Sequence, residues 1–181
     1  MLVAQPGKRD NAGFFSTDLI YDIVDEGKEI GRLVYSKKEL RGSLTLGDEA
    51  YRIERLTGAR DERLYQALIR VMTGGAKPPA NPYALKDAGG RALALGEQIR
   101  QGFAVGRGDD SFTFRKPSLF SRLYHLYRHG SEDSLGSVGQ EKLLGRTLHM
   151  RLPAEFDPAF QVFLLALLLN LGMQALENSP S

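Results

Sequence analysis

The feature that most constrains the fold is a segment near the C-terminus that is apolar on every face. It reads FQVFLLALLLNL from Phe160 to Leu171. Asp157 can cap a helix and Pro158 can occupy its first turn, so we expect a helix from residue 158 to about 176. A surface helix has a polar side, whereas a helix that is apolar all round lies inside protein or inside lipid. The chain must therefore provide, or find, an apolar surrounding for this segment.

Burial within the protein fits this helix better than a membrane span. The stretch from Phe160 to Leu176 has 17 residues, at the lower limit for crossing a bilayer, and it carries three amide side chains. No Lys or Arg follows Arg151, although cations usually flank spanning helices. Its eleven large apolar side chains would contribute about 15–30 kcal/mol on burial, before the entropy cost is subtracted. We expect the preceding strands to close around the helix.

A repeated pattern of a Tyr, an aliphatic residue two positions later and a Gly four positions after that predicts β-hairpins. The aliphatic residue shares a strand face with the Tyr, and the Gly allows a tight turn. Three copies share this spacing: Tyr21-x-Ile23 with Gly27, Tyr83-x-Leu85 with Gly89, and Tyr124-x-Leu126 with Gly130. A fourth, Tyr51-x-Ile53 with Gly58, differs by one residue. The first and third continue into Ile30-Gly31-x-Leu33 and Leu135-Gly136-x-Val138. Coincidence in a Gly-rich chain is the alternative to a true structural repeat.

The rest of the chain contains further short strand candidates and two ambiguous stretches. The additional strands are Ser43–Leu46, Ala92–Leu95, Gly102–Val105 and Ser111–Arg115. Residues 62–72 have helical periodicity, and residues 74–82 are rich in Gly and Pro and are expected to form a loop. Residues 118–128 fit a capped helix or a strand, and the hairpin spacing favours the strand.

Length and composition predict one domain with no general affinity for nucleic acid. The chain has 181 residues, and 24 Lys and Arg against 22 Asp and Glu give a net charge of +2. It has no cysteine, which excludes disulfides, thiolate metal sites and cysteine nucleophiles and suits a cytoplasmic protein. The first 13 residues lack the apolar run of a secretory signal. We expect a flexible segment over 1–13, a single barrel domain over 14–176 and a tail over 177–181.

Hairpins followed by a very apolar C-terminal helix resemble the Tubby C-terminal-like superfamily, which includes tubby proteins, phospholipid scramblases and LURP-one-related proteins. The resemblance covers about residues 14–176. Its most specific part is Pro158-Ala159-Phe160-Gln161-Val162-Phe163, which is similar to the Ala-Phe-Gln-x-Phe stretch in the closing helix of tubby proteins. The segments Glu29–Leu33 and Ser134–Val138 are similar to the bacterial LURP-one-like pattern. The resemblance implies a closed antiparallel β-barrel of about twelve strands around a buried C-terminal helix, a mainly β fold.

The same resemblance implies a function at membranes. Tubby proteins bind phosphoinositide headgroups and scramblases act at membranes, so the chain is expected to bind anionic phospholipid, without being transmembrane, at the inner face of the membrane. No motif here matches the headgroup-binding basic residues of tubby proteins. The sequence lacks three features of scramblases: a cysteine cluster, a proline-rich tail and an acidic calcium-binding loop. Fold alone does not decide between these roles.

The best candidate for anion binding is a basic stretch between residues 100 and 128. Six cations face two carboxylates there, a local balance of +4, and the planar fork of Arg suits phosphate. A solvated barrel exterior is the alternative explanation. The candidate ligand-binding residues are Arg107, Arg115, Lys116, Arg122 and Arg128.

The other candidate sites are weaker, and we expect neither an enzyme nor a bound cofactor. His125 and His129 lie four residues apart, which in a strand means about 13 Å, too far for one metal ion, so surface histidines are favoured over a zinc site. Gly136-Ser137-Val138-Gly139 is one residue short of a nucleophile elbow. The alternative to lipid binding is a protein-interaction scaffold whose partner docks on residues 74–82 or on a barrel edge.

Overall fold

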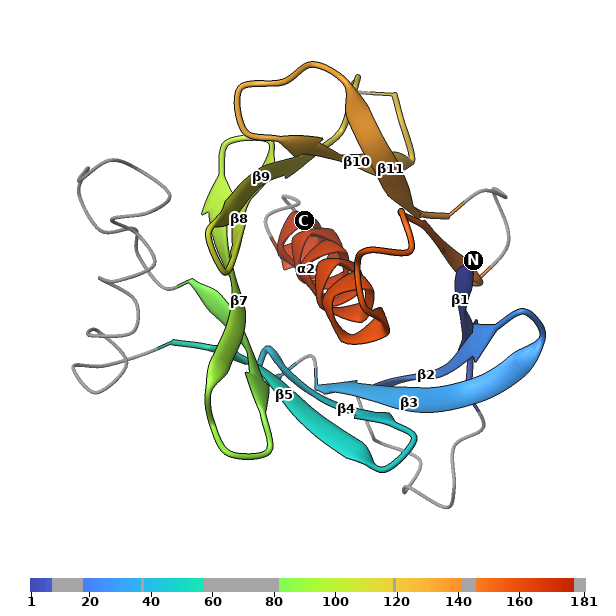
Figure 1. Ribbon diagram of the computed structural model, residues 1–181. Coiled ribbons are helices and arrows are strands. Elements are labelled where there is room, and N and C mark those ends of the chain that lie inside the picture. Colours follow the sequence, from blue (N-terminus) through green and yellow to red (C-terminus); the bar gives the residue numbers. More distant parts are fainter. Residues whose placement is uncertain (8–17, 37, 57–81, 119, 141–145, 178–181) are drawn as a thin grey trace.

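The chain folds into a β-barrel that surrounds its C-terminal helix (Figure 1). The structure is a computed structural model that describes residues 1–7, 18–36, 38–56, 82–118, 120–140 and 146–177, with side chains up to residue 171. These residues form twelve strands and one helix. The elements are β1 (Leu2–Pro6), β2 (Leu19–Asp25), β3 (Lys28–Ser36), β4 (Arg41–Leu46), β5 (Glu49–Arg55), β6 (Tyr83–Asp87), β7 (Ala92–Ile99), β8 (Gly102–Arg107), β9 (Asp110–Arg115), β10 (Leu123–Arg128), β11 (Ser134–Gly139), β12 (Leu148–Arg151) and α2 (Pro158–Glu177). The expected mainly β fold with a closed barrel is confirmed.

The barrel is an up-and-down meander in which every strand pairs antiparallel with its neighbours in sequence. Closure comes from β1, which pairs with β2 on one side and with β12 on the other. The closing register places Leu2 opposite Met150 and Ala4 opposite Leu148, and all four side chains are buried. The expected flexible segment over 1–13 is therefore wrong for Leu2–Pro6, since these residues complete the wall and remove the free edges that β2 and β12 would otherwise expose.

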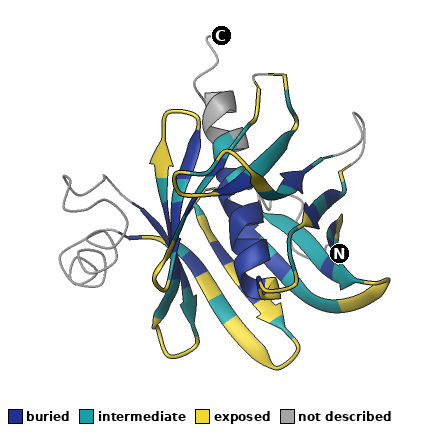
Figure 2. Ribbon diagram, turned by 45° about the horizontal axis from the view of Figure 1, so that its top comes forward, coloured by how far each residue is buried: buried dark blue, intermediate teal, exposed yellow. Residues whose placement is uncertain are grey.

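The helix α2 lies inside the barrel, as its sequence requires. Every residue from Ala159 to Leu167 is buried, and the helix is dark blue at the centre of the barrel in Figure 2. Asp157 caps it, because its Oδ1 accepts a hydrogen bond of 2.9 Å from the Phe160 N–H. Gln161 is buried with a partner, since its Nε2 donates to the Phe156 carbonyl oxygen at 2.7 Å. The described residues include no helix long and apolar enough to cross a membrane.

The repeated Tyr-x-aliphatic pattern is a structural repeat. Each of the three full copies forms a hairpin, β2–β3, β6–β7 or β10–β11, and each hairpin has an irregularity of the register directly after the aliphatic residue. One residue on the return strand is thereby left unpaired: Ile30, Leu93 or Leu135. All three pack against the core. A β-bulge bends a strand and increases its twist, so the shared spacing reflects bulges at equivalent places around the barrel.

The remaining expectations divide between confirmed strands and segments outside the described residues. The four additional strand candidates lie in β4, β7, β8 and β9. Residues 123–128 are a strand, the favoured alternative for 118–128. Tyr51 and Ile53 lie in β5, but Gly58 lies outside the described residues, as do the helix expected over 62–72 and residues 74–81 of the expected loop.

Candidate anion-binding end of the barrel

The meander sorts its connections into two groups, one at each end of the barrel. At the end where α2 begins, the helix-start end, lie the turns after β2, β4, β6, β8 and β10 and the segment between β12 and α2. The turns after β3, β7 and β9, with the described flanks of the longer connections, lie at the opposite end. We call this the helix-exit end, because Leu171 of α2 lies beside its β7–β8 turn.

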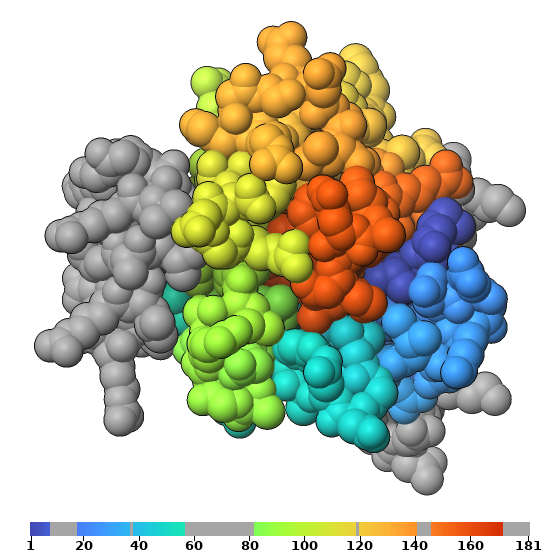
Figure 3. Space-filling view, in the orientation of Figure 1, coloured from blue at the N-terminus to red at the C-terminus, as the bar shows by residue number. Residues whose placement is uncertain are grey.

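The helix-start end is acidic. Its turns carry eleven carboxylates against five side-chain cations and the N-terminal amine, a local balance of −5. The carboxylates are Asp25, Glu26, Asp48, Glu49, Asp87, Asp109, Asp110, Glu132, Asp133, Glu155 and Asp157. The cations are Lys28, Arg91, Arg107, Arg128 and Arg151. In Figure 3, which faces this end, the segment leading into α2 and the start of the helix fill the mouth between the hairpins.

The helix-exit end is basic. Its described connecting residues carry eight cations against two carboxylates, a local balance of +6. The cations are Lys38, Arg41, Arg55, Arg100, Arg115, Lys116, Arg122 and Arg146, and the carboxylates are Asp18 and Glu39. The chain as a whole has a net charge of only +2, yet the described residues at the two ends of the barrel carry charges of opposite sign. Asp157, which caps the helix, places a carboxylate at the positive pole of the helix dipole, where a negative charge is stabilising.

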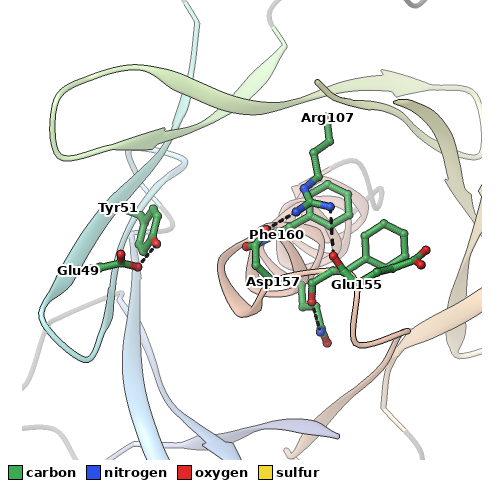
Figure 4. A network of polar contacts seen from close by, with 8 residues as sticks. Glu49, Tyr51, Arg107, Glu155, Asp157 and Phe160 are labelled. Atoms are coloured by element: carbon green, nitrogen blue, oxygen red, sulfur yellow. Dashed lines mark hydrogen bonds and ion pairs between the residues drawn. The ribbon is translucent and has the colours of Figure 1, made fainter. Parts of the chain in front are cut away.

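Two of the five predicted site residues, Arg107 and Arg128, lie at the acidic end and have protein partners. The Arg107 Nη2 donates to the Asp157 Oδ2 at 2.6 Å, and its guanidinium carbon lies 5.2 Å from the centre of the Phe160 ring (Figure 4). The Arg128 Nη1 donates to the Asp110 Oδ1 at 3.1 Å. These arginines therefore balance carboxylates of the helix-start end, and the basic stretch of the sequence does not form one site.

An uncharged donor, the Tyr51 phenol, also binds a carboxylate at the acidic end. Tyr51 donates a hydrogen bond to Glu49 near the start of β5 (Figure 4). The Glu49 carboxylate raises the pKa of Tyr51 to about 12, since ionising the phenol would break this bond and place two negative charges together. Tyr51, Arg107 and Arg128 thus each bind a carboxylate of this end.

The other three predicted residues, Arg115, Lys116 and Arg122, lie at the helix-exit end. Arg115 and Lys116, together with Arg100, line a groove of about 400 Å³ beside the emerging helix. The remaining lining residues are Gln98, Ile99, Gln101, Gly102, Pro117, Ser118, Tyr124 and Leu171. Among the described lining residues there is no carboxylate, and these residues offer amides, cations and a phenol to a ligand.

Aromatic rings support the cations at this end. The Lys116 Nζ lies 5.4 Å from the centre of the Tyr124 ring, and the Arg115 guanidinium carbon lies 4.9 Å from that of Tyr127. Ring contacts of this kind stabilise a cation and limit the freedom of its side chain. Burial raises the pKa of Tyr124 above the ordinary value of 10.0, so its phenol is a neutral hydrogen-bond donor at physiological pH and stays protonated to a higher pH than a free tyrosine.

The groove exists because the β7–β8 turn lies tight against β9. A Cβ atom at Gly102 would lie 2.1 Å from the Phe114 carbonyl oxygen, so only glycine allows this approach. The sequence prediction missed the groove residues outside the basic stretch, such as Gln98, Ile99 and Leu171. A signal was present, since alternate connections of a meander share an end. The described connections after β3, β7 and β9 carry a net positive charge, whereas those after β2, β4, β8 and β10 carry a net negative charge.

The two histidines considered as zinc ligands have other surroundings. The His125 Nδ1 lies 2.9 Å from the Ser134 Oγ, and its ring stacks on Tyr127. His129 lies in the exposed β10–β11 turn. Within the described part of the chain, no three residues of the metal-binding types come together.

Comparisons of the chain with protein-family models, with curated proteins and with solved structures find no match. The geometry and the charge of the barrel ends are the features of this chain that point to a function.

Proposed function

We propose that the protein is a non-catalytic binding module that recognises anionic phospholipid headgroups with its helix-exit end. The observation that carries the proposal is the separation of charge along the barrel: the described connecting residues have a balance of +6 at one end and −5 at the other. A molecule charged in this way is oriented by a negative surface, because its basic end is attracted and its acidic end is repelled. Each Lys or Arg near an anionic membrane contributes about 1 kcal/mol to binding.

The groove gives this end a place for a phosphate group. Arg100, Arg115 and Lys116 all line this groove of about 400 Å³. Guanidinium groups bind phosphate oxygens through paired hydrogen bonds, and an ammonium group adds a point charge. Arg122, in the same connection as Lys116, adds a further cation at the exposed surface.

The architecture agrees with the proposed family. A closed barrel around an apolar C-terminal helix is what the resemblance to the Tubby C-terminal-like superfamily implied, and this family includes membrane-binding proteins. We propose accordingly that the protein works in the cytoplasm at the inner face of the membrane.

The alternative role as a protein-interaction scaffold finds less support. A partner docking on a barrel edge needs a strand with unpaired backbone groups, and each described strand is paired on both sides. The other proposed docking place, the loop over 74–82, lies outside the described residues apart from Pro82.

Co-sedimentation with vesicles tests the proposal. The protein is expected to sediment with phosphatidylcholine vesicles that contain phosphatidylserine or phosphoinositide, and not with phosphatidylcholine alone. The double variant Arg115→Glu/Arg122→Glu is expected to lose at least tenfold in affinity, by roughly 1 kcal/mol for each charge removed. The matched control is Arg91→Glu/Arg128→Glu, which makes the same change in net charge at the acidic end and should retain binding.

Two results would overturn the proposal. One is the absence of binding to anionic vesicles at low ionic strength, where attraction between surface charges is strongest. The other is equal loss of binding in both double variants, which would mean that net charge alone, and not the helix-exit end, is recognised.

A further inference from the structure

Exposed apolar side chains are concentrated at the same end as the cations. Three large hydrophobic residues of the described chain are exposed: Met1 at 58%, Ile99 at 37% and Phe120 at 96%. Ile99 and Phe120 belong to the β7–β8 and β9–β10 connections of the helix-exit end. A ring as exposed as that of Phe120 gains nothing from the protein's own core, so its presence in this position needs another explanation.

The connection that carries Phe120 is held by hydrogen bonds on either side of it. The Ser121 N–H donates to the Ser118 carbonyl oxygen at 3.1 Å, and the Ser121 hydroxyl donates to the Leu123 carbonyl oxygen at 2.9 Å. The Leu123 N–H in turn donates to the Ser121 Oγ at 3.2 Å. Ser121 is thus held by three hydrogen bonds, and the Phe120 side chain beside it is exposed to solvent.

Ile99, the other exposed apolar residue of this end, lies at the groove itself. It lines the groove together with Pro117 and Ser118, the residues that lead into the Phe120 turn. Each apolar residue also has a cation close by in sequence, Arg100 beside Ile99 and Arg122 two positions after Phe120. The end therefore presents apolar tips interleaved with guanidinium groups.

Such an arrangement matches the layers of an anionic bilayer. Apolar side chains gain free energy in the region between headgroups and acyl chains, while Arg and Lys keep their charges at the level of the phosphates. A free phosphate or a soluble headgroup offers no apolar layer, so it would leave Phe120 and Ile99 exposed.

We propose that Phe120 and Ile99 insert into the surface of an anionic membrane, so that the ligand of the helix-exit end is the bilayer and not a free headgroup. This inference rests on the proposed function and adds which side chains enter the membrane and to which layer of the bilayer they reach. It makes Phe120 the principal anchor, since its side chain is the larger and by far the more exposed.

The chain has no tryptophan, so a Phe120→Trp variant carries a single fluorescent reporter at the anchor. Vesicles with phosphatidylserine are expected to shift its emission to shorter wavelength, and lipids brominated near the headgroup should quench it. Inorganic phosphate and soluble glycerophosphoserine should leave the emission unchanged. The control is Ala88→Trp, in the exposed β6–β7 turn of the opposite end, whose emission should not respond to vesicles.

Affinity provides the second measurement. Phe120→Ser is expected to weaken partitioning onto anionic vesicles about tenfold, whereas Phe120→Leu should stay within about threefold of the original chain. Because the ring is 96% exposed, neither change should affect folding, which thermal unfolding checks.

The outcomes separate this inference from the proposed function. If the original chain sediments with anionic vesicles but the Phe120→Trp emission does not shift, insertion is wrong and headgroup recognition stands. Unchanged affinity of Phe120→Ser would equally contradict insertion. If the original chain does not sediment with anionic vesicles at all, the proposed function and the insertion fail together.

Discussion

Arg107 and Asp157 join the barrel wall to the helix that the wall encloses. The Arg107 Nη2 on β8 donates to the Asp157 Oδ2 at 2.6 Å, while the Oδ1 of the same carboxylate caps α2 at the Phe160 N–H. One side chain thus ends the hydrogen bonding of the helix and fixes the helix against a strand. This explains why Arg107, one of the predicted ligand-binding residues, is not available to a ligand.

The two roles of Asp157 can be separated by substitution. Asp157→Asn keeps an oxygen for the cap and removes the charge pair, and should cost about 0.5 kcal/mol, since the two side chains are 32% and 49% exposed. Asp157→Ala removes the cap as well and should cost about 1–2 kcal/mol. Urea unfolding measures both values. Equal losses for the two variants would show that the carboxylate does not cap the helix.

The repeated bulges make a prediction about two glycines. A Cβ atom would lie 2.0 Å from the Thr45 carbonyl oxygen at Gly31, and 2.2 Å from the Arg151 carbonyl oxygen at Gly136. Alanine at either position must displace a neighbouring strand, so Gly31→Ala and Gly136→Ala should each cost about 1–3 kcal/mol. Gly89→Ala is the control, because a Cβ there meets only the Asp87 carboxylate, at 3.3 Å. Urea unfolding of the three variants tests whether close strand approach explains the pattern.

The helix contains one polar side chain whose burial costs stability. Asn170 is fully buried, and within the part of the chain that the structure describes neither its amide nitrogen nor its amide oxygen has a hydrogen-bond partner. It lies close enough to the Tyr83 phenol to lower the pKa of that group, without reaching hydrogen-bond geometry. Asn170→Leu should therefore stabilise the protein by about 1–3 kcal/mol.

Gln161 provides the opposite case on the same helix. Its buried amide donates to the Phe156 carbonyl oxygen at 2.7 Å, so Gln161→Met should destabilise the protein by about 1 kcal/mol. Thermal or urea unfolding of Asn170→Leu and Gln161→Met measures the two changes in stability. A destabilised Asn170→Leu variant would mean that the Asn170 amide is satisfied within the barrel.

Buried tyrosines make the protein sensitive to high pH. Burial raises the pKa of Tyr35 and, less strongly, that of Tyr83, above the ordinary value of 10.0 that the unfolded chain retains. Each phenol stays protonated to a higher pH in the folded state than in the unfolded chain. Its contribution to stability is therefore complete below about pH 10 and is lost as the pH rises through the pKa of the folded state. The free energy of unfolding should fall above about pH 10 by up to about 1.4 kcal/mol per pH unit for each such tyrosine.

Tyr35→Phe tests this assignment. The variant lacks the titrating hydroxyl, so its free energy of unfolding should decline less steeply with pH than that of the original chain. Urea unfolding at a series of alkaline pH values gives the two slopes. Identical slopes would show that Tyr35 ionises at its ordinary pKa in the folded state.

The helix and the hairpins could be predicted because their signals are local. The segment from Phe160 to Leu171 is apolar on all sides, which by itself requires a surrounding wall. Tyr21, Tyr83 and Tyr124 begin hairpins of constant spacing, and this spacing reflects bulges that a sequence pattern records residue by residue. Both features rest on residues close together in the chain.

What the sequence could not show depends on residues far apart. The strand β1 presents only Leu2 and Ala4 to the core, and its pairing with β12 joins residues nearly the whole chain apart. Arg107 and Arg115 are eight positions apart, yet they lie at opposite ends of the barrel because one strand separates their connections. The cations of the basic stretch therefore lie at two opposite ends of the barrel, although the sequence suggested a single site. The role proposed for Phe120 depends on its exposure, which the sequence does not show.

The most direct test of the account is to determine which end of the barrel faces an anionic membrane. The chain has no cysteine, so Ser118→Cys at the helix-exit end and Ala88→Cys at the helix-start end each accept one fluorescent label. With vesicles that contain phosphatidylserine and a quencher attached to the lipid headgroups, the label at position 118 should be strongly quenched and the label at position 88 should not. Equal quenching of both labels, or stronger quenching at position 88, would contradict the account.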